Sequence, residues 1–186
     1  CRDLIHLLRA TTTHSRDYAE DLIIAKLDVQ KAFDRLKHKA VRRTLTKLQL
    51  QPALIEAIMD VIQNKHLLYN VTNGHQTPHV PLTRGLLQGC PLSPTIFRLV
   101  MTLTFNKLTT TWLARGYGTT TKNGTPIPAT VYADDVFLMT NNKRHMTNMC
   151  NDLNHELKQL GLALSTDKTT VCTNNHDWTG QQLKTT

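Results

Sequence analysis

The spacing of hydrophobic residues changes along this chain, and it predicts a series of helices and strands. Residues 2–10 carry leucine and isoleucine at helical spacing, and a polar, threonine-rich stretch follows them. Residues 21–29 are a nearly continuous apolar run, which predicts a mostly buried strand. Residues 35–50 predict a basic amphipathic helix, and residues 53–63 continue it after a proline that suits the start of a helix.

Turn residues separate hairpins and longer helices in the rest of the chain. Residues 67–83 hold two extended arms around an Asn-Gly pair, which is a strong hairpin signal. Residues 94–114 predict a long helix, and a glycine-rich loop with a second Asn-Gly pair follows it. Residues 143–160 predict another helix, for which Gly161 is a natural C-terminal cap. Two short strands, LALS and TTVC, end the pattern.

A further hairpin is predicted at residues 130–139, TVYADDVFLM, and it contains two adjacent aspartates. Asp134 and Asp135 stand between apolar arms, where an unpaired carboxylate is costly to desolvate. Either something compensates these charges, or the pair is a plain surface turn, since Asp is a good turn residue.

The order of these elements is helix, strand, two helices, hairpin, helix, hairpin, helix and strand. This order predicts an α+β fold with an antiparallel sheet packed on helices. The chain has 186 residues and 40% hydrophobic content, which is enough for one domain with a sizeable core. No apolar run is long enough to span a membrane, so we expect no membrane partner.

The charge balance points to an anionic partner. Lys and Arg number 22 against 14 Asp and Glu, a formal net charge of +8, and nucleic acid is the usual partner of such a chain. Many of the basic residues gather around the strand that ends at Asp28, where they could contact backbone phosphates or simply form a solvated helix face. They are Lys26, Lys31, Arg35, Lys37, Lys39, Arg42, Arg43 and Lys47.

Candidate chemistry lies at the ends of two predicted strands. Asp28 ends one strand and Asp134 lies at the tip of the later hairpin. If the two strands are neighbours the carboxylates converge, and divalent cations with oxygen ligands, such as Mg²⁺, relieve the repulsion. Two such ions roughly 3.5–4 Å apart are a known device for in-line displacement at phosphorus. Between the two, Gly85 and Gly89 allow the backbone to approach another molecule closely.

Four segments, in this order, resemble motifs A, B, C and D of the reverse transcriptase palm, in the versions found in non-LTR retrotransposons. The resemblance implies a polymerase palm-type antiparallel sheet packed on helices, with part of the fingers, as a single domain fragment over 1–186. The N-terminal fingers, the primer grip and the thumb have no counterpart, so we expect a piece of a longer protein. The motifs are LDVQKAFDRL (27–36), RGLLQGCPLSPTIF (84–97), VYADDVF (131–137) and GLALSTDKTTV (161–171).

The resemblance implies roles for the acidic residues and one lysine. Asp28 and Asp134 would hold two Mg²⁺ ions, for which Mn²⁺ is a possible substitute. Asp135 would contribute to the metals less directly, and the backbone carbonyl of Val29 is the third ligand position. Lys168 would stabilise or protonate the leaving pyrophosphate, unless it is one surface lysine among many.

The resemblance also implies a nucleotide pocket. Phe33 would be the steric gate that excludes a ribose 2′-OH, although it could instead be a core aromatic. Gln88 and Gly89 would line the pocket for nucleotide and template, although Gln88 could be an ordinary polar residue before a helix. Tyr132 could lie in the core or contact the primer. A viral RNA-dependent RNA polymerase would place a polar group at the gate.

The implied activity is RNA-directed DNA polymerisation. The 3′-OH of a DNA primer would attack the α-phosphate of a dNTP on an RNA template, inside the cell in the nucleus or cytoplasm. The alternative is a non-catalytic nucleic-acid-binding remnant of a reverse transcriptase. Because the segments that grip triphosphate and duplex are absent from the sequence, we expect these 186 residues alone not to extend a primer.

Overall fold

The computed structural model describes residues 2–63, 83–122, 124–132 and 135–174, and only the backbone of four short strands between 63 and 83. The described chain divides into two compact units. We call them the sheet unit and the helical unit. The sheet unit comprises Cys1–Gln30, Thr104–Lys158 and Ala163–Thr186, and the helical unit comprises Lys31–Leu103 and Gln159–Leu162.

A four-stranded antiparallel sheet, in the order β10-β1-β9-β8, forms the centre of the sheet unit. Its interior strand β1 (Ile23–Val29) matches the predicted apolar run, and its side chains alternate between a buried and a more exposed face. The predicted antiparallel α+β architecture is confirmed. The other strands are β8 (Ala129–Tyr132), β9 (Asp135–Thr140) and β10 (Leu164–Thr173).

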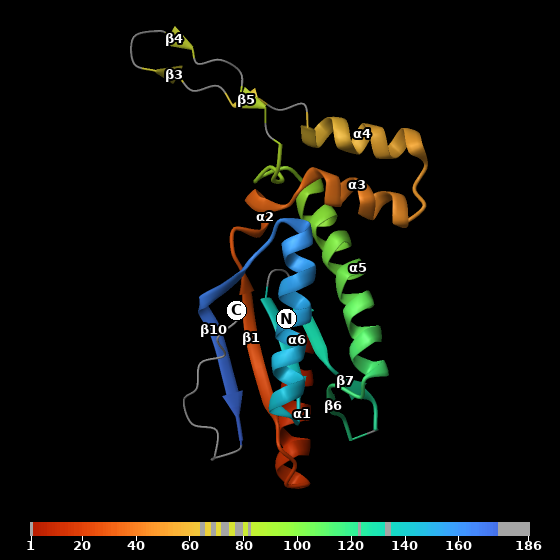
Figure 1. Ribbon diagram of the computed structural model, residues 1–186, viewed down its shortest axis with the longest axis vertical. Coiled ribbons are helices and arrows are strands. Elements are labelled where there is room, and N and C mark those ends of the chain that lie inside the picture. The colour runs from red at the N-terminus through yellow and green to blue at the C-terminus, as the bar shows by residue number, and fades with distance from the viewer. Residues whose placement is uncertain are drawn as a thin grey trace. The chain divides into compact units, whose positions relative to one another are not determined.

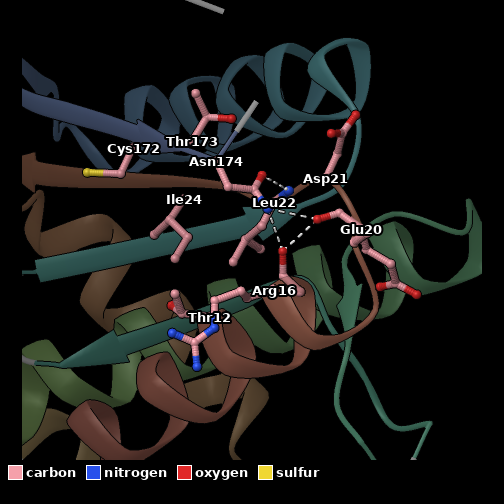
Figure 2. A pocket seen from close by; sticks show the side chains of 11 residues that line it. Thr12, Arg16, Glu20, Asp21, Leu22, Ile24, Cys172, Thr173 and Asn174 are labelled. Carbon is pink, nitrogen blue, oxygen red and sulfur yellow. Dashed lines mark hydrogen bonds between the residues drawn. The ribbon is translucent and has the colours of Figure 1, made fainter. Parts of the chain in front are cut away.

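Helices cover both faces of this sheet. Helix α6 (Lys143–Leu160) lies over one face and α1 (Arg2–Asp17) over the other (Figures 1 and 2). The apolar stripe of α6 is fully buried, and its burial raises the pKa of the Cys150 thiol to about 12. Asn142 caps the helix by accepting a hydrogen bond from the amide of Arg144 at 2.8 Å.

A small polar network joins α1 to the sheet (Figure 2). The Asn174 side chain accepts a hydrogen bond from the amide of Leu22 at 2.8 Å and donates to Ser15 Oγ at 2.7 Å and to the carbonyl of Glu20 at 2.8 Å. These contacts satisfy backbone groups in the turn between α1 and β1. Ser15, Glu20, Leu22 and Asn174 also line a pocket of about 540 Å³ between α1 and the sheet. Ile24 lines the same pocket from β1.

The helix α5 (Leu92–Ala114) is shared by both units, and its C-terminal half packs against α6 in the sheet unit. Trp112 is fully buried there and donates its indole N–H to Asp152 at 3.0 Å. Arg115 reaches the same carboxylate at 2.9 Å. The glycine-rich loop after α5 forms the small pair β6 (Thr119–Thr120) and β7 (Pro126–Ile127).

The helical unit begins directly after β1. It contains α2 (Ala32–Arg35), α3 (His38–Lys47) and α4 (Pro52–Gln63). The predicted extended arms are present as strand pairs, although the turn at Asn73 and Gly74 lies outside the described residues. The pairs are β2 (His66–Leu67) with β5 (Val80–Pro81), and β3 (Asn70–Val71) with β4 (His75–Gln76).

Three predicted boundaries were wrong. Helix α1 continues through the threonine-rich stretch to Asp17, and within it Thr11 and Thr12 donate their hydroxyls to carbonyls one turn back. The basic helix over 35–50 is broken, because Lys37 is extended and its amide bonds the carbonyl of Leu160. The two final strands are one strand, β10, with a break in register. No described helix is long and apolar enough to cross a membrane.

Candidate active site

Two of the predicted aspartates face each other across neighbouring strands. Asp28 on β1 is paired directly with Asp135 on β9, which puts their Cα atoms about 4.5–5.5 Å apart and their side chains on one face of the sheet. The Asp28 side chain is 18% exposed and that of Asp135 is 37% exposed. Asp134 lies outside the described residues, so its predicted metal role stays a prediction.

Each aspartate has a lysine as its partner. Lys168 Nζ lies 3.4 Å from Asp28 Oδ2, and Lys26 Nζ lies 3.1 Å from Asp135 Oδ1. Two facing carboxylates at this distance repel one another, and the two ammonium groups offset that repulsion. Both aspartates are therefore compensated by charges within the chain itself.

Lys168 projects from an irregularity in β10, opposite the end of β1. Lys26 pairs with Thr170 and Asp28 pairs with Ser165, so residues 166–169 of β10 stand opposite a single residue of β1. The Thr169 hydroxyl donates to the carbonyl of Ser165 at 2.7 Å and closes this bulge. Without the bulge, the register of Lys26 and Thr170 would continue to place Lys168 directly opposite Asp28; with it, Ser165 takes that position and Lys168 reaches Asp28 from the bulge.

The donors present fit a hard divalent cation. Carboxylate oxygens from two adjacent strands are ligands that Mg²⁺ accepts, and it commonly completes its shell with waters and substrate phosphates. Val29 ends β1 directly after Asp28. Its side chain is buried, so its backbone carbonyl is the only group it could offer as a metal ligand. Within the described residues no group of three or more His, Cys, Asp or Glu gathers.

The predicted gate residue lies in the helical unit. Phe33 is half-buried on α2, and its ring packs in a tilted arrangement against Phe97 of α5 with the centroids 5.1 Å apart. Its carbonyl accepts a hydrogen bond from the amide of Leu86 at 2.6 Å. The ring is thus held by packing and by its backbone, while part of it stays accessible.

The glycine-containing segment that resembles motif B lies against the residues that follow Phe33. Gly85 has a φ of +93°, and a Cβ there would lie 2.8 Å from the carbonyl oxygen of Asp34, so the close approach requires glycine. The buried His38 ring bonds the carbonyl of Gly85 at 2.8 Å. Gln88 donates to Asp34 Oδ1 at 3.2 Å, and Gly89 lies in open space with a φ of +85°.

The members of the predicted basic cluster differ in their exposure and in their partners. Arg42 makes a two-point hydrogen bond to Glu56, which holds the pKa of that carboxyl below its usual range. Lys26 is paired with Asp135 as described above. The remaining members of the predicted basic cluster expose their side chains in the helical unit, namely Lys31, Arg35, Lys37, Lys39, Arg43 and Lys47.

Three residues of these sites were not predicted in these roles. Asp34 and His38 act through contacts with residues 54 and 47 positions away, and no spacing in the sequence signals such contacts. The sequence predicts Lys26 only as a member of the basic cluster. Its spacing of two residues from Asp28 in the same strand could have indicated the contact, because side chains two apart lie on the same face of a sheet.

A family model for "Reverse transcriptase (RNA-dependent DNA polymerase)" matches residues 3–183 of the chain. The chain belongs to this family. The facing Asp28 and Asp135 lie within the matched residues, in the segments that resemble motifs A and C.

Relatives among known proteins indicate the non-LTR type of reverse transcriptase. The Pol polyprotein of a type-1 R2 retrotransposable element of Popillia japonica is 30% identical over 136 residues, covering 73% of this chain and 19% of that protein. The Drosophila melanogaster R2DM polyprotein is 28% identical over 168 residues, covering 90% of this chain and 15% of that protein. The reverse transcriptase chain thus spans less than a fifth of these relatives.

Solved structures confirm the palm-type fold. Telomerase from Candida albicans, in complex with the TWJ fragment of telomeric RNA, matches with a TM-score of 0.71 at 16% identity, covering 94% of this chain and 30% of that one. Apo telomerase from Candida tropicalis, truncated from its C-terminal domain, matches with a TM-score of 0.68 at 18% identity, covering 91% and 34%. At this identity the likeness concerns the fold of the reverse transcriptase chain.

Proposed function

We propose that this chain is the palm of an RNA-directed DNA polymerase, which extends a DNA primer on an RNA template with dNTPs. The supporting observation is the pair of facing aspartates, Asp28 and Asp135, on adjacent strands of a reverse transcriptase sheet. A relative's polyprotein is several times longer than this chain, so the activity of any whole protein is part of the proposal.

Asp28 and Asp134 would hold two Mg²⁺ ions together with the Val29 carbonyl, with Asp135 beside them, and Mn²⁺ could replace Mg²⁺. Such ions, when bound, polarise the attacking primer hydroxyl and neutralise charge on the phosphates and leaving pyrophosphate. The fold of the chain holds the ligand residues in fixed positions. Asp28 sits on an interior strand bonded on both sides, so its oxygens need little reorganisation during the reaction.

Lys168 would act on the leaving pyrophosphate, by stabilising its charge or donating a proton. Its side chain is 72% exposed and its contact with Asp28 is 3.4 Å long. Because the ammonium end is largely in solvent, it can turn from Asp28 to a phosphate. Asp28 would then be free at the time when the triphosphate is present.

Phe33 would exclude the ribose 2′-OH, and Gln88 and Gly89 would line the pocket for nucleotide and template. The Phe33 ring is held against Phe97, so it resists displacement by an incoming sugar. The bond from Gln88 to Asp34 orients that amide, and the open space at Gly89 leaves the backbone approachable. The contact that distinguishes a deoxynucleotide would be steric.

The exposed basic residues of the helical unit would hold template and primer through their phosphates. The formal charge of +8 and the presence of RNA in two of the similar telomerase structures support this proposal. Binding of this kind depends steeply on salt, because each neutralised phosphate releases counterions. The activity would take place inside the cell, in the nucleus or cytoplasm.

The deciding experiment is primer extension on an RNA template by the complete gene product that contains this chain, wild type against Asp134→Ala. The proposal predicts Mg²⁺-dependent DNA synthesis that the substitution removes. A folded product that binds primer and template but never extends the primer would instead support the non-catalytic remnant.

A further inference from the structure

Lys26 occupies an unusual position for a lysine, the middle of an interior strand. Strand β1 lies between β9 and β10, and the neighbours Ala25 and Leu27 are 0% and 1% exposed. Because side chains alternate along a strand, Lys26 shares with Asp28 the face opposite these two residues. It has no sheet edge to reach around, so its side chain must lie over the face that carries Asp28.

Two contacts on β9 show in which direction the Lys26 side chain extends. The residue directly across from Lys26 on β9 is Phe137, and the ammonium lies 5.8 Å from the centroid of that ring. Its ion pair is instead with Asp135, one same-face position further along β9, at 3.1 Å. The side chain therefore runs diagonally past an aromatic ring toward the carboxylates.

The two lysines at the site, Lys168 and Lys26, differ in the exposure of their side chains and in the distance to their aspartates. Lys168 projects from the β10 bulge and is 72% exposed, whereas Lys26 is 46% exposed and stands on the central strand. The contact of Lys26 is also the shorter one, at 3.1 Å against 3.4 Å. The counter-ion of Asp28 is thus the more accessible to solvent, and the counter-ion of Asp135 is the more closely held.

We propose that Lys26 is a positioning residue of the metal site: its ammonium stays on Asp135 and leaves Asp28 as the carboxylate that takes the metal. The inference rests on the proposed function. Lys26 lowers the negative charge that an arriving divalent ion meets, so the ion binds more weakly than two free carboxylates would bind it. Asp135 affects metal binding indirectly, because its carboxylate neutralises and positions the Lys26 ammonium.

Binding of Mn²⁺ to the 186-residue chain, followed by electron paramagnetic resonance of the free ion, tests this proposal. Lys26→Met keeps the aliphatic stem and removes the charge. At an ionic strength of about 10 mM, where screening is weak, a unit charge acting on a divalent ion across roughly 8 Å of water-like dielectric changes its Kd about three- to tenfold. We therefore expect Lys26→Met to tighten Mn²⁺ binding by that factor, and Lys26→Arg to stay within about twofold of wild type.

The matched control is Lys107→Met. Lys107 pairs with Glu156 at 2.6 Å between α5 and α6, and its side chain is 60% exposed. The substitution removes the same charge and one ion pair without touching the sheet. We expect its Kd for Mn²⁺ to stay within about twofold of wild type.

A second pair of variants separates a direct ligand from an indirect one. Asp28→Asn should remove detectable Mn²⁺ binding. Asp135→Asn leaves the Lys26 ammonium unpaired and should weaken binding about three- to tenfold. In the double variant Lys26→Met/Asp135→Asn both charges are gone, so the Kd should return to within about twofold of wild type.

Several outcomes would overturn the proposal. Lys26→Met could leave the Kd unchanged or weaken it, or the double variant could bind no better than Asp135→Asn alone; either result removes the positioning role while the metal site stands. If Asp28→Asn leaves Mn²⁺ binding intact, the proposed metal site fails and this inference fails with it. Lys26→Gln replaces Lys26→Met if thermal melting shows that the latter does not fold.

Discussion

Replacing Phe33 by valine tests the proposed sugar gate, and the structure sets the accompanying loss of stability. Truncating a fully buried phenylalanine destabilises a protein by about 3–5 kcal/mol, and an aromatic pair adds about 0.5–1.5 kcal/mol beyond burial. Phe33 is only half-buried, and valine keeps part of its apolar contact with Phe97. We therefore expect a loss of about 1–2 kcal/mol, which a domain of ordinary stability tolerates.

The expected functional effect is larger than this structural one. Valine leaves a gap of several carbon atoms where the ring stood, so a ribose 2′-OH is no longer excluded. We expect the ratio of kcat/KM for rNTP over dNTP to rise at least tenfold, about 1.4 kcal/mol in the difference between two transition-state energies. Single-nucleotide extension with matched rNTP and dNTP, by the complete gene product, measures the ratio.

Phe97→Leu is the matched control, because it removes the same ring stacking and leaves the ring at Phe33 in place. It should lower the melting temperature to a similar extent and leave the sugar ratio within about twofold of wild type. An unchanged ratio in Phe33→Val, with a lower melting temperature, would make Phe33 a packing residue. An equal rise in both variants would attribute the change to loosening of the helical unit, and either result would refute the gate.

Three further predictions concern the metal site, the glycine loop and the junction of α1 with the sheet. Asp28→Ala or Asp134→Ala should lower the extension rate of the complete gene product by at least about three decades, roughly 4 kcal/mol, and residual activity within tenfold of wild type would contradict the metal assignment. Gly85→Ala should lose at least about 1 kcal/mol more unfolding free energy in urea than Gly89→Ala. Both carry a positive φ that disfavours alanine by about 1–2 kcal/mol, but only at Gly85 would the Cβ meet a backbone oxygen at 2.8 Å; equal losses would show that the loop moves aside. Asn174→Ala should cost about 1–3 kcal/mol in the same assay, because the buried amide of the turn loses its partner, and a loss below about 0.5 kcal/mol would mean that water replaces the side chain.

Much of the fold and of the site followed from local pattern. The apolar run of β1 and the periodicity of α6 determine their own conformation, because burial of one face stabilises each element wherever it packs. The resemblance then identified Asp28, Asp134 and Asp135 as candidates, and the structure shows Asp28 paired with Asp135 across β1 and β9, while Asp134 lies outside the described residues. The break after α2 was not predictable in this way, because the extended Lys37 is held by the carbonyl of Leu160, far along the chain.

The sequence by itself determined which residue types are available, where strands end and that the carboxylates require compensation. Only the tertiary structure decided what compensates them. Lys168 reaches Asp28 because β10 pairs with β1, although a bulge places Ser165 opposite Asp28, and neither strand encodes alone which strand it pairs with or where the pairing shifts. Lys26 reaches Asp135 because antiparallel register places β9 beside β1 in one alignment, and a shift by one residue would turn the pair to opposite faces. Charge compensation here depends on register, and register is set by the packing of the whole sheet.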